Sequence, residues 1–255
     1  MNMNGFVRNE VFFMRDYKSE FEKRVKFIKS VIAESGAKGI VYGNSGGKDS
    51  ALVGILCKAA CDNTIGLILP CTSKRNYNED TDDAKAVAAK YNIETRIIDL
   101  NSVKEAELKV LADAVIMNEM ALANIAPRLR MLTLYAIAAA ENCLVAGTGN
   151  KSETYVGYFT KWGDGACDFN PIADLTVTEI YEFLRFLNAP KCVIEKAPSA
   201  ALFDGQTDER EMGITYAEID CYISGEKVAP ETKEIIEHMH RTSAHKRNGV
   251  IVYTQ

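Results

Sequence analysis

From the N-terminal region to Gly147, segments with apolar residues at helical spacing alternate with short continuous apolar runs. Apolar side chains three or four positions apart indicate helices, and short runs of β-branched and apolar residues indicate buried strands. Between Tyr17 and Ser35, for example, Phe21, Val25 and Ile28 recur at helical spacing. The predicted elements are helices at 17–35, 51–60, 80–91, 103–122 and 127–142, and strands at 39–42, 64–69, 94–100 and 143–147.

This order of strands and helices predicts the fold class. Parallel neighbouring strands need crossover connections, and these are usually helices. We therefore expect a doubly wound α/β domain, with a parallel sheet flanked by helices on both faces. After Gly147 the sequence changes to glycine-bearing loops and an amphipathic helix around 180–187, which we expect to cover the ligand-binding edge of the sheet. No repeat or linker divides the sequence, so we expect a single domain over residues 1–255.

Two segments carry more specific expectations. Residues 197–213 contain glycines, a proline and several acidic residues, and we expect a mobile loop because so little apolar surface is available to order it. The helix over 127–140 has small and apolar residues on nearly every side, which predicts burial all round.

The overall composition argues against several classes of function. A hydrophobic fraction of 47% with 25% charged residues is typical of a globular protein. The formal net charge of -5 argues against a surface that binds nucleic acid. Seven scattered cysteines without a CxxC pair indicate reduced thiols and no zinc site. No run approaches the about 18 apolar residues of a membrane span and no signal peptide is evident, so we expect a cytoplasmic protein with no membrane partner.

The candidate chemistry begins with the hexapeptide SGGKDS at 45–50, between a predicted strand and a predicted helix. Its glycines let the backbone approach a polyanion closely, its serines offer hydroxyl groups, and the following helix directs free N–H groups at a phosphate. The hexapeptide matches neither GxxxxGK[ST] nor GxGxxG. A tight turn is the simplest alternative for a Gly-Gly pair. The position between strand and helix favours a phosphate site, as does the carboxylate of Asp49, which suits magnesium.

SGGKDS resembles the SGGxDS pyrophosphate loop of the N-type ATP pyrophosphatases, or PP-loop family, which cleave ATP between the α and β phosphates. The resemblance implies an adenine nucleotide alpha hydrolase-like fold. That family includes NAD, GMP and asparagine synthetases and tRNA-modifying enzymes, and the loop alone does not distinguish them. The ATP ligands that it implies are Gly43, Ser45, Gly46, Gly47, Lys48, Asp49 and Ser50.

Later segments resemble the ammonia-dependent NAD synthetase family, in the same order and at compatible spacing. The resemblance runs from about Phe21 to Arg247. The segments are NIAPRLRM at 124–131, GTGNKSE at 147–153, GYFTKWGDG at 157–165, Asp168, KAPS at 196–199, GITY at 213–216 and HKR at 245–247.

This second resemblance implies roles for particular residues. Asp49 and Glu153 would coordinate the Mg²⁺ bound to the departing pyrophosphate, and Thr148 and Ser199 would join the ATP site. Asp168 would be catalytic together with Asp49 and Glu153. Asp164 or Asp168 is a candidate acceptor for a proton as ammonia is captured. The residues implied to bind deamido-NAD (nicotinic acid adenine dinucleotide) are Arg128, Lys161, Asp168, His245 and Lys246. A homodimer formed through helices near Arg128 is implied as well.

Two positions depart from the family pattern. Ser199 replaces the usual threonine and keeps its hydroxyl group, whereas Val177 replaces a lysine and cannot supply a cation. Either another lysine compensates, or the ATP site is less positively charged in this chain. The candidates for compensation are Lys151, Lys161 and Lys196.

The reaction implied by the resemblance is a two-step amide synthesis by a carbon-nitrogen ligase. The nicotinate carboxylate attacks the α phosphorus of ATP, and ammonia then displaces AMP from the acyl adenylate to give NAD. Glutamine-using relatives carry an additional nitrilase-type amidase domain, for which 255 residues leave no room, so free ammonia or a separate partner is the expected nitrogen source.

Two rival functions stay open from the sequence. Another PP-loop ligase or a tRNA-modifying enzyme would share the adenylation step, although the acidic net charge weakens the tRNA version. A module that binds adenine nucleotide without cleaving it belongs to a different class. The two carboxylates Asp49 and Glu153 argue against such a module, because a pure binder has less need of them.

Overall fold

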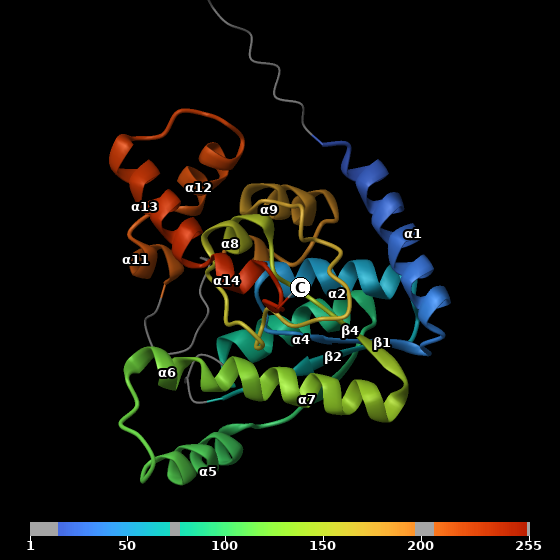
Figure 1. Cartoon of the computed structure of the whole chain (residues 1–255). Coiled ribbons are helices and arrows are strands. Elements are labelled where there is room, and N and C mark those ends of the chain that lie inside the picture. The colour runs from blue at the N-terminus through green and yellow to red at the C-terminus, as the bar shows by residue number, and fades with distance from the viewer. Residues whose placement is uncertain (1–14, 72–76, 197–206, 254–255) are drawn as a thin grey trace, which may run out of the picture.

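In the part of the chain that the structure describes, a sheet of four parallel strands lies at the centre (Figure 1). The computed structural model describes residues 15–71, 77–196 and 207–253. The strand order of the sheet is β3-β2-β1-β4. The chain therefore proceeds outward from β1 to β3 and then returns to the other side of β1. The strands are β1 (Gly39–Gly43), β2 (Thr64–Ile68), β3 (Glu94–Ile97) and β4 (Cys143–Ala146).

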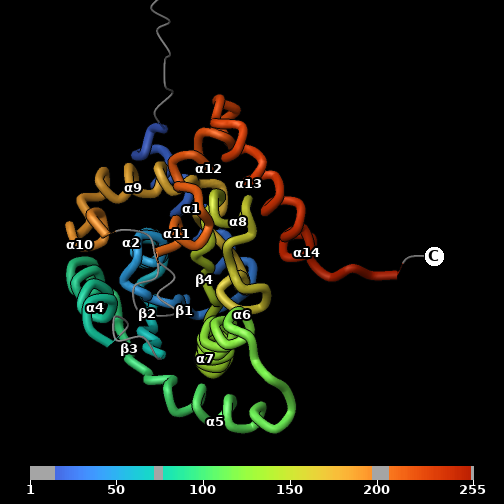
Figure 2. Tube along the Cα trace, turned by 90° about the vertical axis from the view of Figure 1, so that its left-hand side faces the viewer, coloured from blue at the N-terminus to red at the C-terminus, as the bar shows by residue number. Residues whose placement is uncertain are grey.

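Helices connect the strands and cover both faces of the sheet (Figures 1 and 2). On one face α7 packs against β1 and β4, and on the other α2 and α4 pack against β1, β2 and β3. This arrangement confirms the doubly wound α/β fold. The helices are α1 (Tyr17–Ser35), α2 (Lys48–Ala60), α4 (Glu79–Tyr91), α5 (Asn101–Leu111), α6 (Glu119–Ala123), α7 (Ile125–Glu141), α8 (Lys151–Val156), α9 (Val177–Phe186), α10 (Lys191–Ile194), α11 (Asp208–Met212), α12 (Tyr216–Ile223), α13 (Pro230–Thr242) and α14 (Ala244–Arg247).

The core has one apolar cluster on each face of the sheet. Successive side chains of β1 point to opposite faces, so Ile40 and Tyr42 pack with α1, α2 and α9, and Val41 packs under α7. All three are fully buried, which explains why the strand reads as a continuous apolar run. A third cluster joins α8, the start of α9 and the helices α11, α12 and α13, which stand apart from the sheet at the upper left of Figure 1.

Most predicted elements match the observed ones, and the largest difference is at the predicted helix over 103–122. This stretch forms α5 and α6, which are separated by residues 112–118. The side chain of Asn118 accepts a hydrogen bond from the backbone N–H of Ala121 (2.8 Å) and so begins a new helix. Ile116, which lies within the predicted helix, is 98% exposed in the connection.

Two other expectations are wrong in part. Residues 208–212 of the predicted mobile loop form α11, which ends at Gly213 in the left-handed conformation, whereas residues 197–206, including Ser199, lie outside the described residues. The helix over 127–140 is not buried all round within one chain. The buried residues of α7 are Ile125, Ala126, Pro127 and Ala138, and Leu132 is 61% exposed.

All seven cysteines lie among the described residues, and none of them forms a disulfide bond. Within the three described ranges, no helix has both the length and the apolar character that crossing a membrane requires.

Candidate functional site

The candidate site lies where the carboxyl ends of β1 and β4 meet. The chain runs from β1 to β2 on one side and reaches β4 on the other, so the two loops that follow β1 and β4 diverge at this point. Such a switch point leaves a crevice in which doubly wound sheets bind their ligands. The SGGKDS hexapeptide spans the end of the loop after β1 and the first turn of α2, and the loop after β4 leads into α8.

The phosphate loop has a conformation that depends on glycine. Gly46 has a φ of 72°, and a Cβ atom there would lie 2.2 Å from the carbonyl oxygen of Asp80. Gly47 is the N-cap residue of α2 and has no side chain with which to cap it. The first N–H groups of α2 are therefore available to an anion.

Two serines brace the same loop. The Ser50 hydroxyl donates to the carbonyl oxygen of Gly47 (3.1 Å), and the Ser45 Oγ accepts from the backbone N–H of Gly47 (3.3 Å). The two hydroxyl oxygens are 3.1 Å apart. The predicted ATP ligands of this loop are thus brought together around the N-terminus of α2.

Two carboxylates from different helices meet beside the phosphate loop. Asp49 is in the first turn of α2 and Glu153 is in the first turn of α8. The Lys48 ammonium lies between them, 2.7 Å from Asp49 Oδ2 and 3.4 Å from Glu153 Oε1. The sequence prediction paired these two acids, and the structure brings them to the same ammonium group.

Asn150 joins the two carboxylates and was missed by the sequence reasoning. Its Nδ2 donates to Asp49 Oδ1 (3.0 Å), and its Oδ1 accepts from the backbone N–H of Glu153 (2.9 Å), which caps α8. Asn150 is fully buried. An asparagine directly before a short polar helix is an N-cap signal that could have found it.

Glu153 and Lys48 both have perturbed pKa values. Burial, followed by repulsion from Asp49, raises the pKa of Glu153 to about 8. Burial disfavours the charged form of Lys48, but attraction to Asp49 and Glu153 outweighs it and raises the pKa of that ammonium group. Burial and repulsion thus disfavour the charged form of Glu153, and a cation bound beside it would favour that form.

The donor set is compatible with magnesium. Among the described residues, no group of three or more His, Cys, Asp or Glu side chains is arranged so that it could hold a metal ion by itself. Magnesium needs no such group in a nucleotide site, because it is usually bound by one or two carboxylates together with phosphate oxygens and water. Asp49 and Glu153 provide two hard oxygen ligands beside a phosphate loop.

Glu153→Gln is expected to change how the stability of the metal-free protein depends on pH. Because folding raises the pKa of Glu153 from its ordinary value of 4.5 to about 8, the folded protein holds a proton that the unfolded chain releases. The wild type therefore loses stability between these two pH values as pH rises, and the glutamine variant does not. At pH 8.5 the variant should be more stable by roughly 1–4 kcal/mol, with no such gain at pH 4.

The measurement is denaturant unfolding in a chelator at both pH values. Glu22→Gln, which changes an exposed carboxylate of α1, is the control and should follow the wild type throughout. Parallel pH profiles for the wild type and Glu153→Gln would contradict the raised pKa.

Four of the residues predicted to contact deamido-NAD belong to one connected group. An Arg128 guanidinium N–H donates to the carbonyl oxygen of Lys161 (3.3 Å), and the Lys161 ammonium donates to the carbonyl oxygen of His245 (2.6 Å). Lys246 donates to the carbonyl oxygens of Gly157 and Phe159, each at 2.7 Å. The loop over 157–165 is thereby held between α7 and α14.

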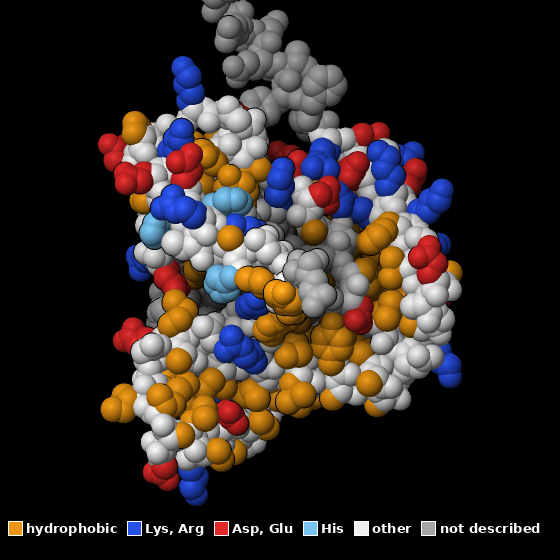
Figure 3. All heavy atoms as spheres, viewed as in Figure 1, with side chains coloured by type: hydrophobic (Ala, Val, Ile, Leu, Met, Phe, Trp, Pro, Cys, Tyr) orange, Lys and Arg blue, Asp and Glu red, His pale blue; other side chains and the backbone are white. Residues whose placement is uncertain are grey.

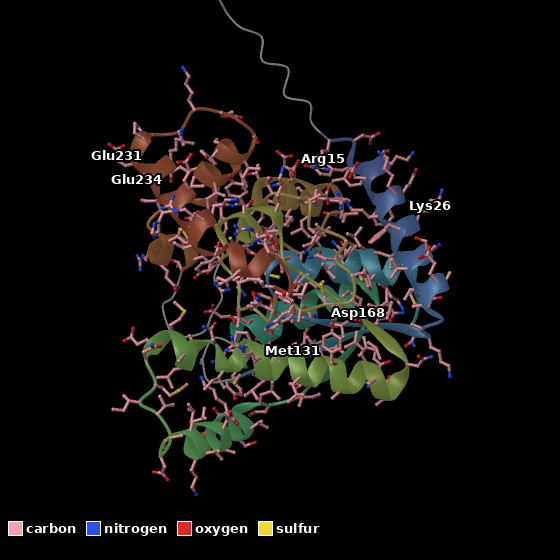
Figure 4. The ribbon with its side chains drawn as sticks, in the orientation of Figure 1. Arg15, Lys26, Met131, Asp168, Glu231 and Glu234 are labelled. Atoms are coloured by element: carbon pink, nitrogen blue, oxygen red, sulfur yellow. The ribbon has the colours of Figure 1, made fainter. Side chains whose placement is uncertain are left out.

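Asp168, the fifth of these residues, has a different set of contacts. It lies near β4 and above α7 in the view of Figure 4, which also labels Met131 on α7. Its Oδ2 accepts from the backbone N–H of Val145 (2.7 Å), and its Oδ1 accepts from the Tyr135 hydroxyl (3.3 Å). Thr148 is partly buried in the loop between β4 and α8.

The structure also places Val177 and the lysines considered as substitutes for the missing cation. Val177 is buried in the helical cluster with Tyr216 and Ile236. Of the three candidates, Lys196 reaches the phosphate loop, because its ammonium donates to the carbonyl oxygen of Gly46 (3.4 Å). That ammonium is also paired with Asp80 (2.7 Å) and Asp83 (2.5 Å). Lys161 is instead bonded to His245.

Comparison with known proteins identifies the family. The family model described as NAD synthase matches residues 20–250. The chain is 44% identical over 235 residues to the NH(3)-dependent NAD(+) synthetase of Carboxydothermus hydrogenoformans, which covers 91% of this chain and 96% of that protein.

Solved structures agree with that match. The NMN synthetase from Francisella tularensis has a TM-score of 0.90 at 37% identity, covering 94% of this chain and 100% of that one. The NH3-dependent NAD synthetase from Campylobacter jejuni has a TM-score of 0.78 at 31% identity, with the same two coverages. The fold, the phosphate loop and the sequence similarity over most of the chain lead to one conclusion: this protein belongs to the NAD synthase family.

Proposed function

We propose that the protein catalyses the ATP-dependent amidation of deamido-NAD by ammonia, releasing NAD, AMP and pyrophosphate. The observation that carries this proposal is the meeting of Asp49 and Glu153 beside an open helix N-terminus at the switch point of the sheet. Relatives more than 40% identical to this chain are named NH(3)-dependent NAD(+) synthetases, which supports both the acceptor and the nitrogen source.

The first step forms a bond between the nicotinate carboxylate and the α phosphorus of ATP and breaks the bond to pyrophosphate. The backbone of Gly46 and Gly47 and the hydroxyls of Ser45 and Ser50 bind the phosphates at the N-terminus of α2. Asp49 and Glu153 would hold Mg²⁺, which when bound neutralises charge on the leaving pyrophosphate.

The second step replaces AMP by ammonia at the activated carbonyl carbon. Arg128, Lys161 and Lys246 provide positive charge that suits the pyrophosphate of the dinucleotide. Asp168, which is held by the Tyr135 hydroxyl and the backbone of β4, is the proposed acceptor for the proton that ammonia loses. We place residues 1–255 in a single domain, with ammonia supplied free or by a separate partner. The cytoplasmic location stays a prediction.

The protein is proposed to act as a homodimer that pairs through α7. Apolar side chains gather over α7 and the lower part of the face seen in Figure 3. Leu132 of α7 is 61% exposed, and Met120 of the adjoining α6 is 63% exposed. A second copy would bury these groups and would explain the apolar composition of the helix all round.

Leu132→Asp is expected to convert the dimer into a monomer, because a charged group would be buried at the centre of the interface. Light scattering after gel filtration measures the mass. Phe27→Asp changes a large apolar residue on α1 that is 44% exposed and should leave the mass at that of the wild type. A wild-type monomer, or a dimer that survives Leu132→Asp, would contradict the interface.

A second acceptor is supported by one observation. The Francisella tularensis structure, with a TM-score of 0.90, belongs to a protein named NMN synthetase. The corresponding acid, nicotinic acid mononucleotide, carries the same nicotinate carboxylate on a smaller molecule. The alternative is therefore amidation of the mononucleotide by the same adenylation chemistry.

One assay distinguishes these functions. The protein is incubated with ATP, magnesium and ammonium, and with either deamido-NAD or nicotinic acid mononucleotide, and the products are separated by chromatography. NAD with AMP and pyrophosphate supports the first proposal, and a larger kcat/KM for the mononucleotide supports the second. Formation of ADP, or no product from either acid, would overturn both.

A further inference from the structure

Lys48 occupies a position where a cation is unfavourable by itself. It is the first residue of α2, at the end of the helix where the macrodipole is positive. Its side chain is only 6% exposed, and its ammonium lies 5.4 Å from the centre of the Tyr216 ring. A buried charge at such a place needs a partner of opposite sign.

The partners of Lys48 are the two acids proposed to hold magnesium. Its ammonium is 2.7 Å from Asp49 and 3.4 Å from Glu153, so it already supplies positive charge to both. Lys196 at the same loop differs in this respect. It is paired with Asp80 and Asp83, which have no part in the proposed metal site.

We propose that Lys48 is the resident counter-ion of Asp49 and Glu153 in the nucleotide-free enzyme and becomes a phosphate ligand when ATP binds with its magnesium. The inference rests on the proposed use of ATP. The ammonium ends a flexible chain of four carbons, so a small change of rotamer exchanges carboxylate oxygens for phosphate oxygens.

This exchange would also compensate for Val177, which stands at the start of α9 where the family pattern has a lysine. Val177 is buried among apolar side chains and brings no charge to the site. Lys48 directly follows the phosphate loop, as the first residue of α2, and would supply a cation there once the acids are occupied. The proposal has two consequences. The nucleotide-free enzyme should bind a divalent cation weakly, and the affinity for the nucleotide should depend on Lys48.

Lys48→Met tests both consequences with one variant. Mn²⁺ binding to the nucleotide-free protein, followed by electron paramagnetic resonance, should become about tenfold tighter or more, because the competing charge has gone. Binding of α,β-methylene ATP with Mg²⁺, followed by calorimetry, should become about tenfold weaker. Lys58→Met is the matched control, since Lys58 is on the same helix and bonds to the carbonyl oxygen of Asp62. It should change neither affinity.

Each result decides a separate part of the proposal. Unchanged Mn²⁺ affinity would overturn the counter-ion role, and unchanged or tighter binding of the ATP analogue would overturn the phosphate role. If thermal melting shows that Lys48→Met is unfolded, Lys48→Gln takes its place with the same expectations. Neither measurement needs turnover. If both affinities change as expected but the protein makes no amide product, the proposed function is overturned and the proposal for Lys48 stands.

Discussion

Asp49→Asn is expected to lower the rate of NAD formation by roughly a hundredfold to a thousandfold. The substitution keeps the size of the side chain and can keep the hydrogen bond from Asn150, but it removes a negative oxygen that faces Lys48. The Mg²⁺ that neutralises the departing pyrophosphate would then lose one of its two proposed carboxylate ligands. The measurement is NAD formed at saturating ATP over a range of magnesium concentrations.

Two controls separate catalysis from folding in this experiment. Asp62→Asn changes a fully exposed aspartate just beyond the other end of α2 and should retain wild-type activity. Circular dichroism should show an intact fold for both variants. Wild-type turnover by Asp49→Asn would remove Asp49 from the proposed metal site.

Gly46→Ala is expected to abolish tight ATP binding and to destabilise the protein by roughly 2–4 kcal/mol. The φ of 72° is unfavourable for alanine, and the added methyl group would lie 2.2 Å from the carbonyl oxygen of Asp80. Either the phosphate loop or the start of α4 would have to move. Denaturant unfolding gives the stability, and calorimetry with an ATP analogue gives the affinity.

Gly36→Ala isolates the part of this effect that comes from φ alone. Gly36 ends α1 with a φ of 69°, and no atom lies within 4 Å of its missing Cβ. Its replacement should destabilise the protein by only about 1 kcal/mol and leave ATP binding unchanged. Equal losses of stability at the two glycines would show that the contact with Asp80 has no energetic effect.

The order of strands and helices could be predicted because each element carries its own apolar spacing. The prediction failed where a single polar residue begins a new helix and where apolar side chains lie on the surface of the chain. Asn118 starts a helix inside a stretch whose apolar spacing suggested one continuous helix. The exposure of Leu132 in one chain could not be read from α7, because apolar composition does not distinguish a core from a contact between two molecules.

The residues of the candidate site also differ in whether the sequence could predict their roles. Asp49 and Glu153 could be paired from their resemblance to a family pattern, although more than 100 residues separate them. The position of Lys48 between them could not, because it depends on how α2 and α8 approach each other in three dimensions. Asn150 could have been noticed as a helix cap, but its bond to Asp49 depends on the same approach.

The contacts of α14 bear on the order in which the site is assembled. This last short helix bonds through Lys246 to the carbonyl oxygens of Gly157 and Phe159, and through Arg247 to that of Tyr155. The bonds within the phosphate loop, by contrast, join Ser45, Gly47 and Ser50 in the first third of the sequence. During synthesis on the ribosome, these bonds can therefore form early, whereas Glu153 and Lys196 join the nucleotide site later and the acceptor half must wait until the final residues have emerged.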